Sequence, residues 1–138
     1  MLSQTAEYAL RTVLFLGDHQ ARALVRVGEL AEALGIPRNY LSKTLHQLAR
    51  AGVLASSRGK LGGFRLARPA ESISLAEVIV PFDGPTATRT CLLGRPVCSD
   101  QSPCTAHARW KGVSAQVSDF FRETTVAELL GSGTSRRK

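Results

Sequence analysis

The chain has 138 residues, 43% of them hydrophobic and 6% aromatic, and its 18 lysines and arginines against 11 aspartates and glutamates give a formal net charge of +7. This length and composition predict one globular domain with an apolar core and exclude two full domains. No apolar run approaches the roughly 20 residues needed to cross a bilayer, and the first residues lack the pattern of a secretory leader, so we expect a cytoplasmic protein.

The positive charge is concentrated in the first half of the chain. Residues 1–70 carry ten lysines and arginines against four acidic residues, and no acidic residue lies between Glu32 and Glu71. Because a solvated surface normally mixes both signs, this acid-free stretch favours a polyanionic partner. The sequence does not show the register of a basic amphipathic helix lying on a membrane, which favours nucleic acid over a membrane surface.

Three helices are predicted in this basic half. Apolar residues at helical spacing predict a helix over residues 5–16, which Gly17 can end in the left-handed conformation. A short second helix begins at Val27 and stops at Gly35, and a third follows over residues 38–51. The third helix has an apolar stripe and, opposite it, a polar stripe of Asn39, Ser42, Lys43 and His46.

Two short helices joined by a tight turn, the second with an acid-free polar face, are typical of a helix-turn-helix; an ordinary helical hairpin is the alternative. Residues 53–55 and 64–66 can form two strands around a turn rich in glycine and basic residues. A basic hairpin directly after a recognition helix is a wing, whose tip can enter a minor groove. The predicted DNA-binding residues are Arg38, Asn39, Tyr40, Ser42, Lys43, His46, Arg58, Lys60 and Arg65.

The second half is predicted to hold a capped helix, an irregular segment and a long helix. Ser74 and Glu77 form a capping box, and Pro81 should kink or end the helix that starts there, so that residues 81–104 are irregular. Beyond this segment, apolar residues recur at alternating spacings of four and three: Ala106, Trp110, Val113, Val117 and Phe120. This seam either packs on its own domain or joins two copies of the chain. We favour the homodimer, because a dimer doubles the contacts to a two-fold DNA site.

The predicted fold class is mainly α with a small β-hairpin wing, a winged helix-turn-helix followed by a long dimerisation helix. Residues 1–80 form the expected DNA-binding domain, and residues 81–104 form a cysteine-bearing loop. Residues 105–130 form the dimerisation helix and a capped C-terminal turn, and residues 131–138 a disordered tail.

Three cysteines, Cys91, Cys98 and Cys104, lie in the irregular segment, and His107 follows three residues after the last of them. An odd number of closely spaced cysteines is a poor disulfide framework. Thiolates are soft ligands that suit iron-sulfur clusters and zinc, and a flexible loop lets three of them converge on one site. Zinc is the weaker option because the tight two-residue spacings of zinc knuckles are missing. Three unligated thiols are the remaining alternative.

Several segments, taken in their order, resemble one known family. They are residues 4–11, 36–37, 40–41, 45–52 and the wing at 57–68, followed by the three loop cysteines. Together they are similar to the Rrf-two family of bacterial transcription regulators, and within it to the iron-sulfur regulators of the IscR and NsrR groups, over residues 1–130. The resemblance implies a dimeric winged helix-turn-helix repressor, occasionally an activator, whose DNA affinity depends on an iron-sulfur cluster held by the three cysteines.

The resemblance also implies two candidates for the fourth cluster ligand. Cys104 and His107 match the Cys-x-x-His pattern that supplies a histidine in the IscR group, and Glu7 lies where the NsrR group has an acidic residue. Six residues separate Cys91 from Cys98 where the best-known members have five, which leaves the number of irons open. The resemblance favours a two-iron cluster, and a four-iron cluster is possible. Such a cluster senses redox state, nitric oxide or the supply of iron and iron-sulfur clusters.

Two other functions are weighed against this one. A regulator without a cluster, which senses oxidants directly with its thiols, is the alternative in the same class. A cysteine hydrolase built on Cys104 and His107 is disfavoured, because no orienting acid and no oxyanion-hole motif accompany that pair. We therefore expect no enzyme and no small-molecule substrate, and as partners a double-stranded DNA operator with two-fold symmetry and a second copy of the chain.

Overall fold

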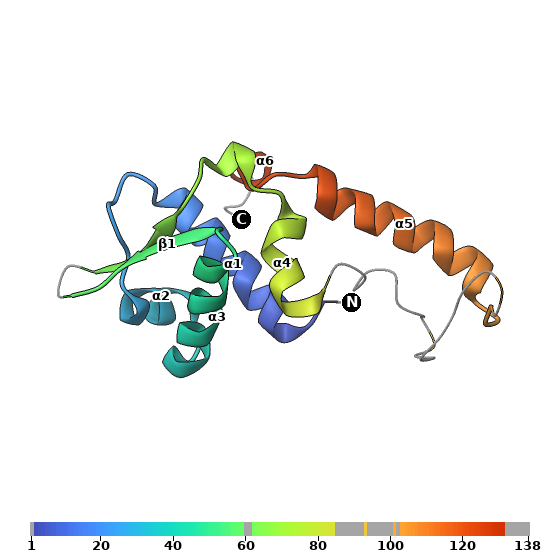
Figure 1. Ribbon diagram of the computed structural model, residues 1–138, viewed down its shortest axis with the longest axis horizontal. Coiled ribbons are helices and arrows are strands. Elements are labelled where there is room, and N and C mark those ends of the chain that lie inside the picture. Colours follow the sequence, from blue (N-terminus) through green and yellow to red (C-terminus); the bar gives the residue numbers. More distant parts are fainter. Residues whose placement is uncertain (1, 60–61, 85–92, 94–100, 102, 132–138) are drawn as a thin grey trace.

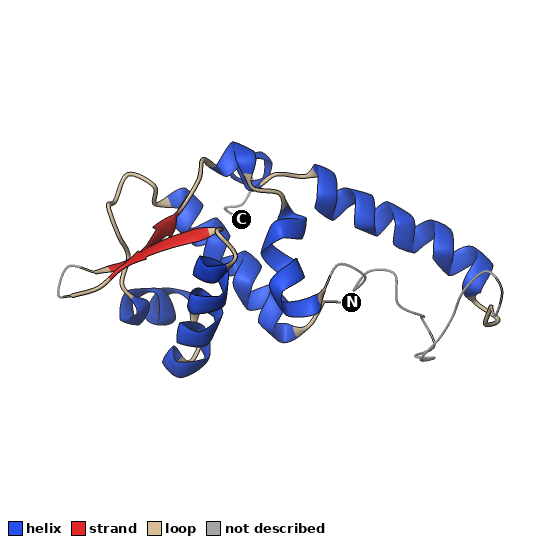
Figure 2. Ribbon diagram, in the orientation of Figure 1, coloured by secondary structure: helices blue, strands red, loops and turns tan. Residues whose placement is uncertain are grey.

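Figure 1 shows the computed structural model, which describes residues 2–59, 62–84, 93, 101 and 103–131. Helices make up most of it, and Figure 2 shows the strands together in one hairpin beside the first three helices. In chain order the elements are α1 (Gln4–Asp18), α2 (Val27–Leu34), α3 (Arg38–Arg50), β1 (Leu54–Ser57), β2 (Gly63–Leu66), the 3-10 helix η1 (Ala70–Ser72), α4 (Leu75–Asp83), α5 (His107–Glu123) and α6 (Val126–Gly131). The predicted fold class, mainly helical with a small hairpin, is confirmed.

The start of α1 is capped, and its end differs from the prediction. The Ser3 hydroxyl accepts a hydrogen bond from the Ala6 N–H at 3.1 Å, which satisfies one of the free amides at the helix start. The prediction that Gly17 ends the helix is wrong, because α1 continues to Asp18 with Gly17 buried in its last turn. A Cβ at Gly17 would lie 2.5 Å from Leu130 Cδ1, so this glycine lets α6 approach α1 closely.

The turn between α2 and α3 follows the prediction. Gly35 ends α2 with a φ of 70°, a left-handed conformation that glycine adopts without strain. Pro37 directly precedes α3, where its fixed φ suits the start of a helix. α3 then packs against both α1 and α2, as the second helix of a helix-turn-helix does.

The hairpin pairs β1 and β2 antiparallel, with Leu54 opposite Leu66. Phe64 of β2 also exchanges two backbone hydrogen bonds with Val25, at 2.9 and 2.8 Å, in the loop before α2. The contact requires Gly63, because a Cβ there would lie 2.5 Å from the Val25 carbonyl oxygen. The hairpin is therefore fixed to the helix-turn-helix along one edge.

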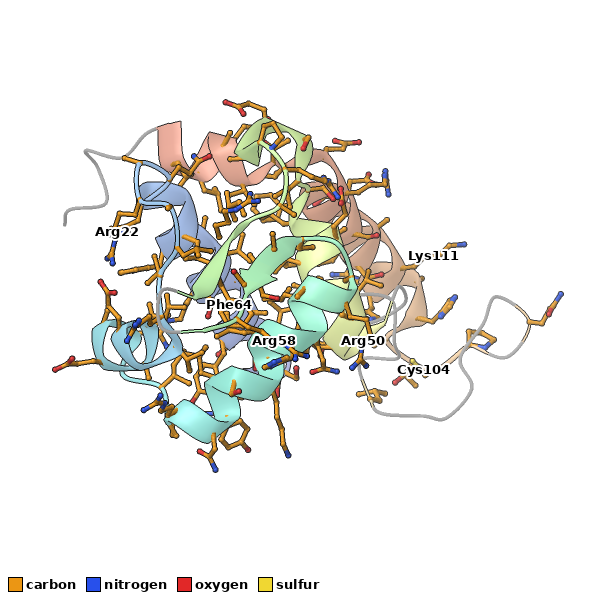
Figure 3. All side chains as sticks on the ribbon, turned by 60° about the vertical axis from the view of Figure 1, so that its left-hand side comes forward. Arg22, Arg50, Arg58, Phe64, Cys104 and Lys111 are labelled. Carbon is orange, nitrogen blue, oxygen red and sulfur yellow. The ribbon has the colours of Figure 1, made fainter. Side chains whose placement is uncertain are left out.

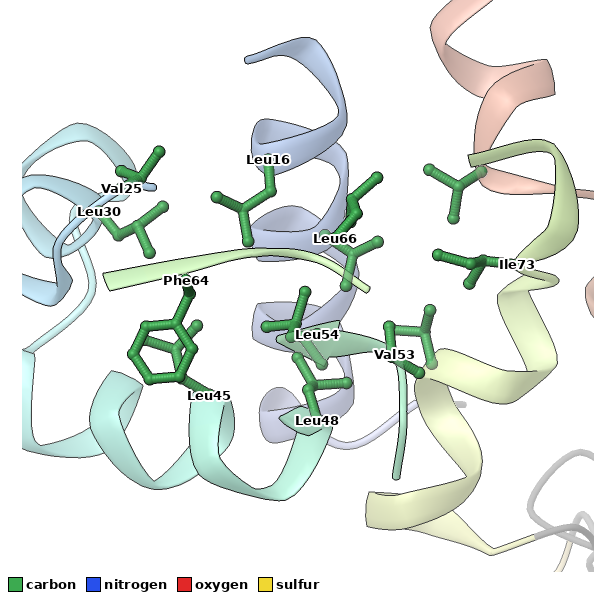
Figure 4. Close-up of a cluster of buried hydrophobic side chains, with 14 of the residues drawn as sticks. Leu16, Val25, Leu30, Leu45, Leu48, Val53, Leu54, Phe64, Leu66 and Ile73 are labelled. Carbon is green, nitrogen blue, oxygen red and sulfur yellow. The ribbon is translucent and has the colours of Figure 1, made fainter. Parts of the chain in front are cut away.

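The apolar core lies between α1, α3, the hairpin and α4 (Figure 4). Leu41, Leu45 and Leu48 of α3 are fully buried in it, and full burial of a leucine side chain is worth about 1.5–3 kcal/mol relative to exposure. Burial of this stripe turns the opposite side of α3 to solvent. The residues packed around it include Leu16, Val25, Leu30, Val53, Leu54, Phe64, Leu66 and Ile73.

α4 begins with the predicted capping box. The Ser74 hydroxyl accepts from the Glu77 N–H at 3.2 Å, and a Glu77 carboxylate oxygen accepts from the Ser74 N–H at 3.3 Å. The prediction that Pro81 ends the helix, so that residues 81–104 are irregular, is wrong for the first three of these residues. α4 continues through Pro81 to Asp83. Pro81 removes one helix hydrogen bond, but the bonding resumes beyond it, where the Gly84 N–H donates to the Val80 carbonyl at 2.9 Å.

α5 extends away from the rest of the molecule, whereas α6 returns to it (Figure 1). The segment between the two helices is held beside the start of α4, where Leu75 N–H donates to the Thr124 carbonyl at 2.9 Å and Val126 N–H donates to the Ile73 carbonyl at 2.8 Å. α6 then packs against α1. One end of α5 is thus attached to the body that carries α3.

The predicted division of the chain into a DNA-binding domain, a cysteine-bearing loop, a dimerisation helix and a tail, with boundaries after residues 80, 104 and 130, stays a prediction. α6 falls in the range grouped with the dimerisation helix, yet it packs against α1 of the predicted DNA-binding domain. Residues 85–92, 94–100, 102 and 132–138, which include most of the predicted cysteine loop and the tail, lie outside the described residues. Within the described ranges, no helix has the length and apolarity that a membrane span requires.

Candidate nucleic-acid interface and cysteine segment

The outward face of α3 carries polar and basic side chains, and the helix contains no acidic residue. The predicted stripe lines one open depression, which Gln47 and Arg50 extend; its residues are Asn39, Ser42, Lys43, His46, Gln47 and Arg50. The prediction omitted Gln47 and Arg50, although they follow Lys43 and His46 at the i+4 spacing of one helix face. Such a face offers donors to base edges and phosphates.

His46 connects this face of α3 with the wing. Its Nδ1 lies 2.7 Å from the Ser42 carbonyl oxygen, so in the neutral ring Nδ1 carries the proton and Nε2 is an acceptor. The ring stands edge-on to Phe64 of β2, with 5.8 Å between centroids and 80° between planes. One side chain thus lies on the predicted recognition face and also contacts strand β2 of the wing.

A groove separates the wing from the starts of α2 and α3. Arg26, Arg38 and Arg58 line it together with His46 and two serines of β1. None of these three arginines forms an ion pair with a carboxylate in the part of the chain that the structure describes. The prediction missed Arg26, since an isolated arginine in a loop belongs to no pattern. Lys60, predicted at the wing tip, lies outside the described residues.

Arg65 lies on a different side of the hairpin from this groove. Phe64 and Leu66 are buried in the core and Arg65 is exposed, as the alternation along a strand requires. Arg65 lines a second depression with His19 and Arg22, and its Nη1 donates to the Leu66 carbonyl at 3.2 Å. The structure therefore does not bring Arg65 together with Arg58.

An ion pair ties the end of the wing to α4. Arg68 Nη2 lies 2.6 Å from Glu77 Oε1, and Arg68 also donates to the Ser72 carbonyl. Partial burial raises the pKa of Glu77, but hydrogen bonds from Arg68 and Ser74 outweigh that effect, so the pKa lies below the ordinary carboxyl value. The capping box of α4 and the wing thus share one carboxylate.

Tyr40 belongs to a small cluster that joins α3 to α1. Its side chain is 49% exposed, and its ring stands edge-on to Tyr8 with 6.2 Å between centroids. The Arg11 guanidinium lies 6.0 Å from the centre of the Tyr8 ring and donates to the Leu34 carbonyl at 2.6 Å. Tyr40 therefore packs on one side and is open to a ligand on the other.

The cysteine segment is described only at its end. Cys91 and Cys98 lie outside the described residues, whereas Cys104 is partly exposed. The His107 N–H donates to the Cys104 carbonyl at 3.1 Å, so these two residues belong to one turn at the start of α5. Figure 3 shows Cys104 well apart from Arg58 and Phe64 at the wing. Glu7 is exposed in the first turn of α1, and no three potential metal ligands come together within the described part of the chain.

The predicted dimer seam is open on α5. Val113 and Phe120 are 49% and 51% exposed, and Ala106, Trp110 and Val117 are partly exposed. The only buried residue of α5 is Ser114. The described part of the chain therefore leaves this apolar seam largely uncovered.

These elements define a class of protein. A helix-turn-helix with an acid-free second helix, followed by a basic hairpin fixed beside it, is a winged helix-turn-helix DNA-binding module.

The chain belongs to the Rrf2 family of iron-dependent transcriptional regulators, whose family model matches residues 2–132. A protein assigned as an HTH-type transcriptional regulator in Aquifex aeolicus is 36% identical over 132 residues, covering 94% of this chain and 91% of that protein. The HTH-type transcriptional regulator IscR of Vibrio campbellii is 32% identical over 129 residues, covering 94% of this chain and 76% of the relative. The resemblance drawn from the sequence motifs is thus confirmed, and the protein is a DNA-binding transcriptional regulator rather than an enzyme.

Solved structures share the fold. CymR, the global cysteine regulator of B. subtilis, matches with a TM-score of 0.77 at 20% identity, covering 96% of this chain and 97% of that chain. IscR of T. potens matches with a TM-score of 0.75 at 22% identity, covering 96% of this chain and 88% of that chain.

Proposed function

We propose that the protein is a homodimeric repressor, acting in the cytoplasm, that binds a two-fold symmetric operator with an affinity controlled by an iron-sulfur cluster. The observation that carries the DNA-binding part is the acid-free outer face of α3 beside the basic groove of the wing. The cluster-binding part is supported by the iron-dependent description of the family and by the similarity to IscR.

In this proposal α3 enters the major groove. Asn39, Ser42 and Lys43 face solvent on the side opposite the buried leucines, where they can reach base edges and phosphates. Arg58, with Lys60 beyond it, contacts the backbone or the adjacent minor groove, where narrow width favours cationic side chains.

The dimer forms through α5 in this proposal. The uncovered seam of Val113 and Phe120 supports it, since two copies of α5 bury those side chains against each other. The attachment of α5 to α4, and of α6 to α1, then fixes the distance between the two recognition helices. That distance must match the spacing of the operator half-sites.

The donor set fits an iron-sulfur cluster. Three thiolates, from Cys91, Cys98 and Cys104, are the soft ligands such clusters take, and one imidazole completes four ligands. We assign the fourth position to His107, because it shares a turn with Cys104, and we favour a two-iron cluster. Glu7 is the alternative; it is not grouped with Cys104 and His107 among the described residues, so it would reach the cluster from another helix or from the partner subunit.

The cluster supplies a centre that redox change, nitric oxide or iron shortage can alter. Its protein ligands lie in the segment that connects the end of α4 to the start of α5. A change in the order of this segment changes how α5 is held, and through the dimer it changes the spacing of the two copies of α3.

A regulator that uses its thiols without a cluster is the second candidate. The likeness in fold to CymR, named as a cysteine regulator, favours it. In that case Cys104, which is partly exposed, reacts directly with oxidants or electrophiles.

Purification without oxygen, followed by optical and Mössbauer spectra, separates the two candidates. We expect a coloured protein, and loss of the colour in alanine variants of Cys91, Cys98 and Cys104. A colourless protein whose operator affinity responds to diamide would establish thiol sensing instead. A native spectrum in His107→Ala together with an altered one in Glu7→Ala would assign the fourth ligand to the partner's α1.

A further inference from the structure

We propose that the groove between the wing and the starts of α2 and α3 is a clamp for one phosphate of the DNA backbone, formed by Arg26, Arg38 and Arg58. The proposal rests on the DNA-binding function and deepens it, because it adds Arg26 and makes the three arginines act on one group.

The three arginines reach the groove from three separate elements. Arg26 is the residue before α2, Arg38 is the first residue of α3, and Arg58 directly follows β1. All three are exposed and line the same groove. The fold therefore brings together side chains that are distant in the sequence.

Such a cluster of like charges is unfavourable without a ligand. Like charges that line one groove repel each other, and the repulsion is stronger beside a low-dielectric protein surface than in bulk water. The ion pairs of the described residues use Arg22, Arg68 and Arg122 and leave the groove arginines without a carboxylate. An anion bound between them removes the repulsion.

The neighbouring acidic residue of α2 is already engaged. Glu29 accepts from Arg22 Nη2 at 2.8 Å and from Arg22 Nη1. The hydrogen bond from Arg22 is the largest cause of the lowered pKa of Glu29, and the charge of Arg26 is the smallest of the causes. Arg22 thus holds the carboxylate in a different pair and leaves Arg26 available.

The guanidinium of Arg38 lies beside Gly28 of α2. A Cβ at Gly28 would lie 3.8 Å from both Cζ and Nη1 of Arg38, so this guanidinium lies against the first turn of α2. No side chain caps α2, because Arg26 at the N-cap offers no acceptor. The amide groups of that turn add to the positive potential on this side.

The position of the groove identifies the anion as a backbone phosphate. It lies between the recognition face of α3 and the wing, and His46 lines both depressions. A strand that passes from the major groove at α3 to the minor groove at the wing must cross this gap. Ser56 and Ser57 line the groove as well and offer hydroxyl donors to the same phosphate.

The test combines protein variants with single neutral phosphates in DNA. A binding duplex is first selected from random sequences with the full-length protein, and a set of duplexes is then made in which one phosphate at a time is a methylphosphonate. We expect wild-type affinity to fall about tenfold at one position in each half-site, the worth of a charge-assisted hydrogen bond. Arg26→Ala and Arg38→Ala should bind the unmodified duplex more weakly and lose their sensitivity at that same position.

Arg122→Ala is the matched control, because it removes one charge from an exposed arginine of α5 outside the groove. It should keep the wild-type sensitivity at every position. Unchanged sensitivity in Arg26→Ala and Arg38→Ala, or loss of sensitivity at different phosphates in the two variants, would overturn the clamp. Failure to select any duplex would overturn DNA binding itself, a separate result.

Discussion

His46 is the residue whose side chain connects the two halves of the interface. It hydrogen-bonds within α3 and stands edge-on to Phe64 in the wing. Its neighbour Lys43 is exposed on the same helix face and makes no ring contact among the described residues. A comparison of variants at His46 and Lys43 therefore distinguishes a role in holding the wing from a role in contacting DNA.

The contact of His46 with Phe64 should be measurable as stability. His46→Ala should lower the free energy of unfolding by about 0.5–1.5 kcal/mol, the worth of an aromatic pair, whereas Lys43→Ala should change it by less than about 0.5 kcal/mol. Urea denaturation measures both, and a double-mutant cycle with Phe64→Leu isolates the pair. A cycle without coupling energy would show that the ring contact does not hold the wing.

Glu77 should make the stability of the DNA-binding body depend on pH. Its pKa is lowered in the folded protein, so the stabilising effect is fully present above the unfolded carboxyl pKa, about 4.3, and is lost as the pH falls through the folded value. Glu77→Gln should flatten this acid-side fall, measured as unfolding free energy between neutral pH and pH about 3. A variant with the same slope as the wild type would contradict the assignment.

At the level of elements, helix ends that depend on neighbouring residues can be predicted from the sequence, whereas those that depend on packing between distant segments cannot. The turn at Gly35 and the capping box at Ser74 are set by residues within a few positions, and both are found as predicted. Gly17 looks like a helix end but lies inside α1, because α6 packs against it from over 100 residues away. Pro81 likewise looks like a helix stop, but α4 continues past it, and the Gly84 N–H still donates to the Val80 carbonyl.

The candidate nucleic-acid interface also has one part that the sequence predicts and one part that it does not. The stripe on α3 is a periodic pattern and was predictable, whereas the groove depends on the approach of the wing to α2. That approach is fixed by the hydrogen bonds between Val25 and Phe64, and a single bridging residue has no period to recognise. For this reason the predicted set omits Arg26 and groups Arg65 with Arg58, although these two line different depressions.

Two glycine substitutions test how the wing and the long helix are built. Gly63→Ala places a methyl group against the Val25 backbone, which cannot move without breaking the bridge, so it should destabilise the protein by about 2 kcal/mol or more. Gly112→Ala fills open space within α5 and should stabilise it by about 0.5–1 kcal/mol. Thermal unfolding distinguishes the two, and equal effects would contradict the packing described for the wing.

At the level of the whole molecule, α5 projects from the body, and the described residues leave Val113 and Phe120 of its apolar seam exposed, while its C-terminal end is attached to α4 through the segment before α6. This arrangement suits a helix that pairs with a second copy and passes a change in that pairing to the DNA-binding body.

Single charges on the seam should break the dimer. Val113→Asp and Phe120→Asp bury a carboxylate in the proposed interface, so each should give a monomer at micromolar concentration in sedimentation experiments. Ala115→Asp places the same charge on the opposite side of α5 and should stay dimeric. Dimers for both seam variants would place the interface elsewhere.

Control of DNA binding by the cluster can be measured with one protein preparation. Operator affinity is determined without oxygen for the freshly purified protein and again after its cluster is removed by a chelator and an oxidant, with the thiols then reduced. We expect the affinity to change by about tenfold or more, within the usual range of coupling between two sites, and Cys104→Ala to show one affinity under both treatments. A protein that carries a cluster and binds its operator equally well with and without it would contradict the proposed mechanism.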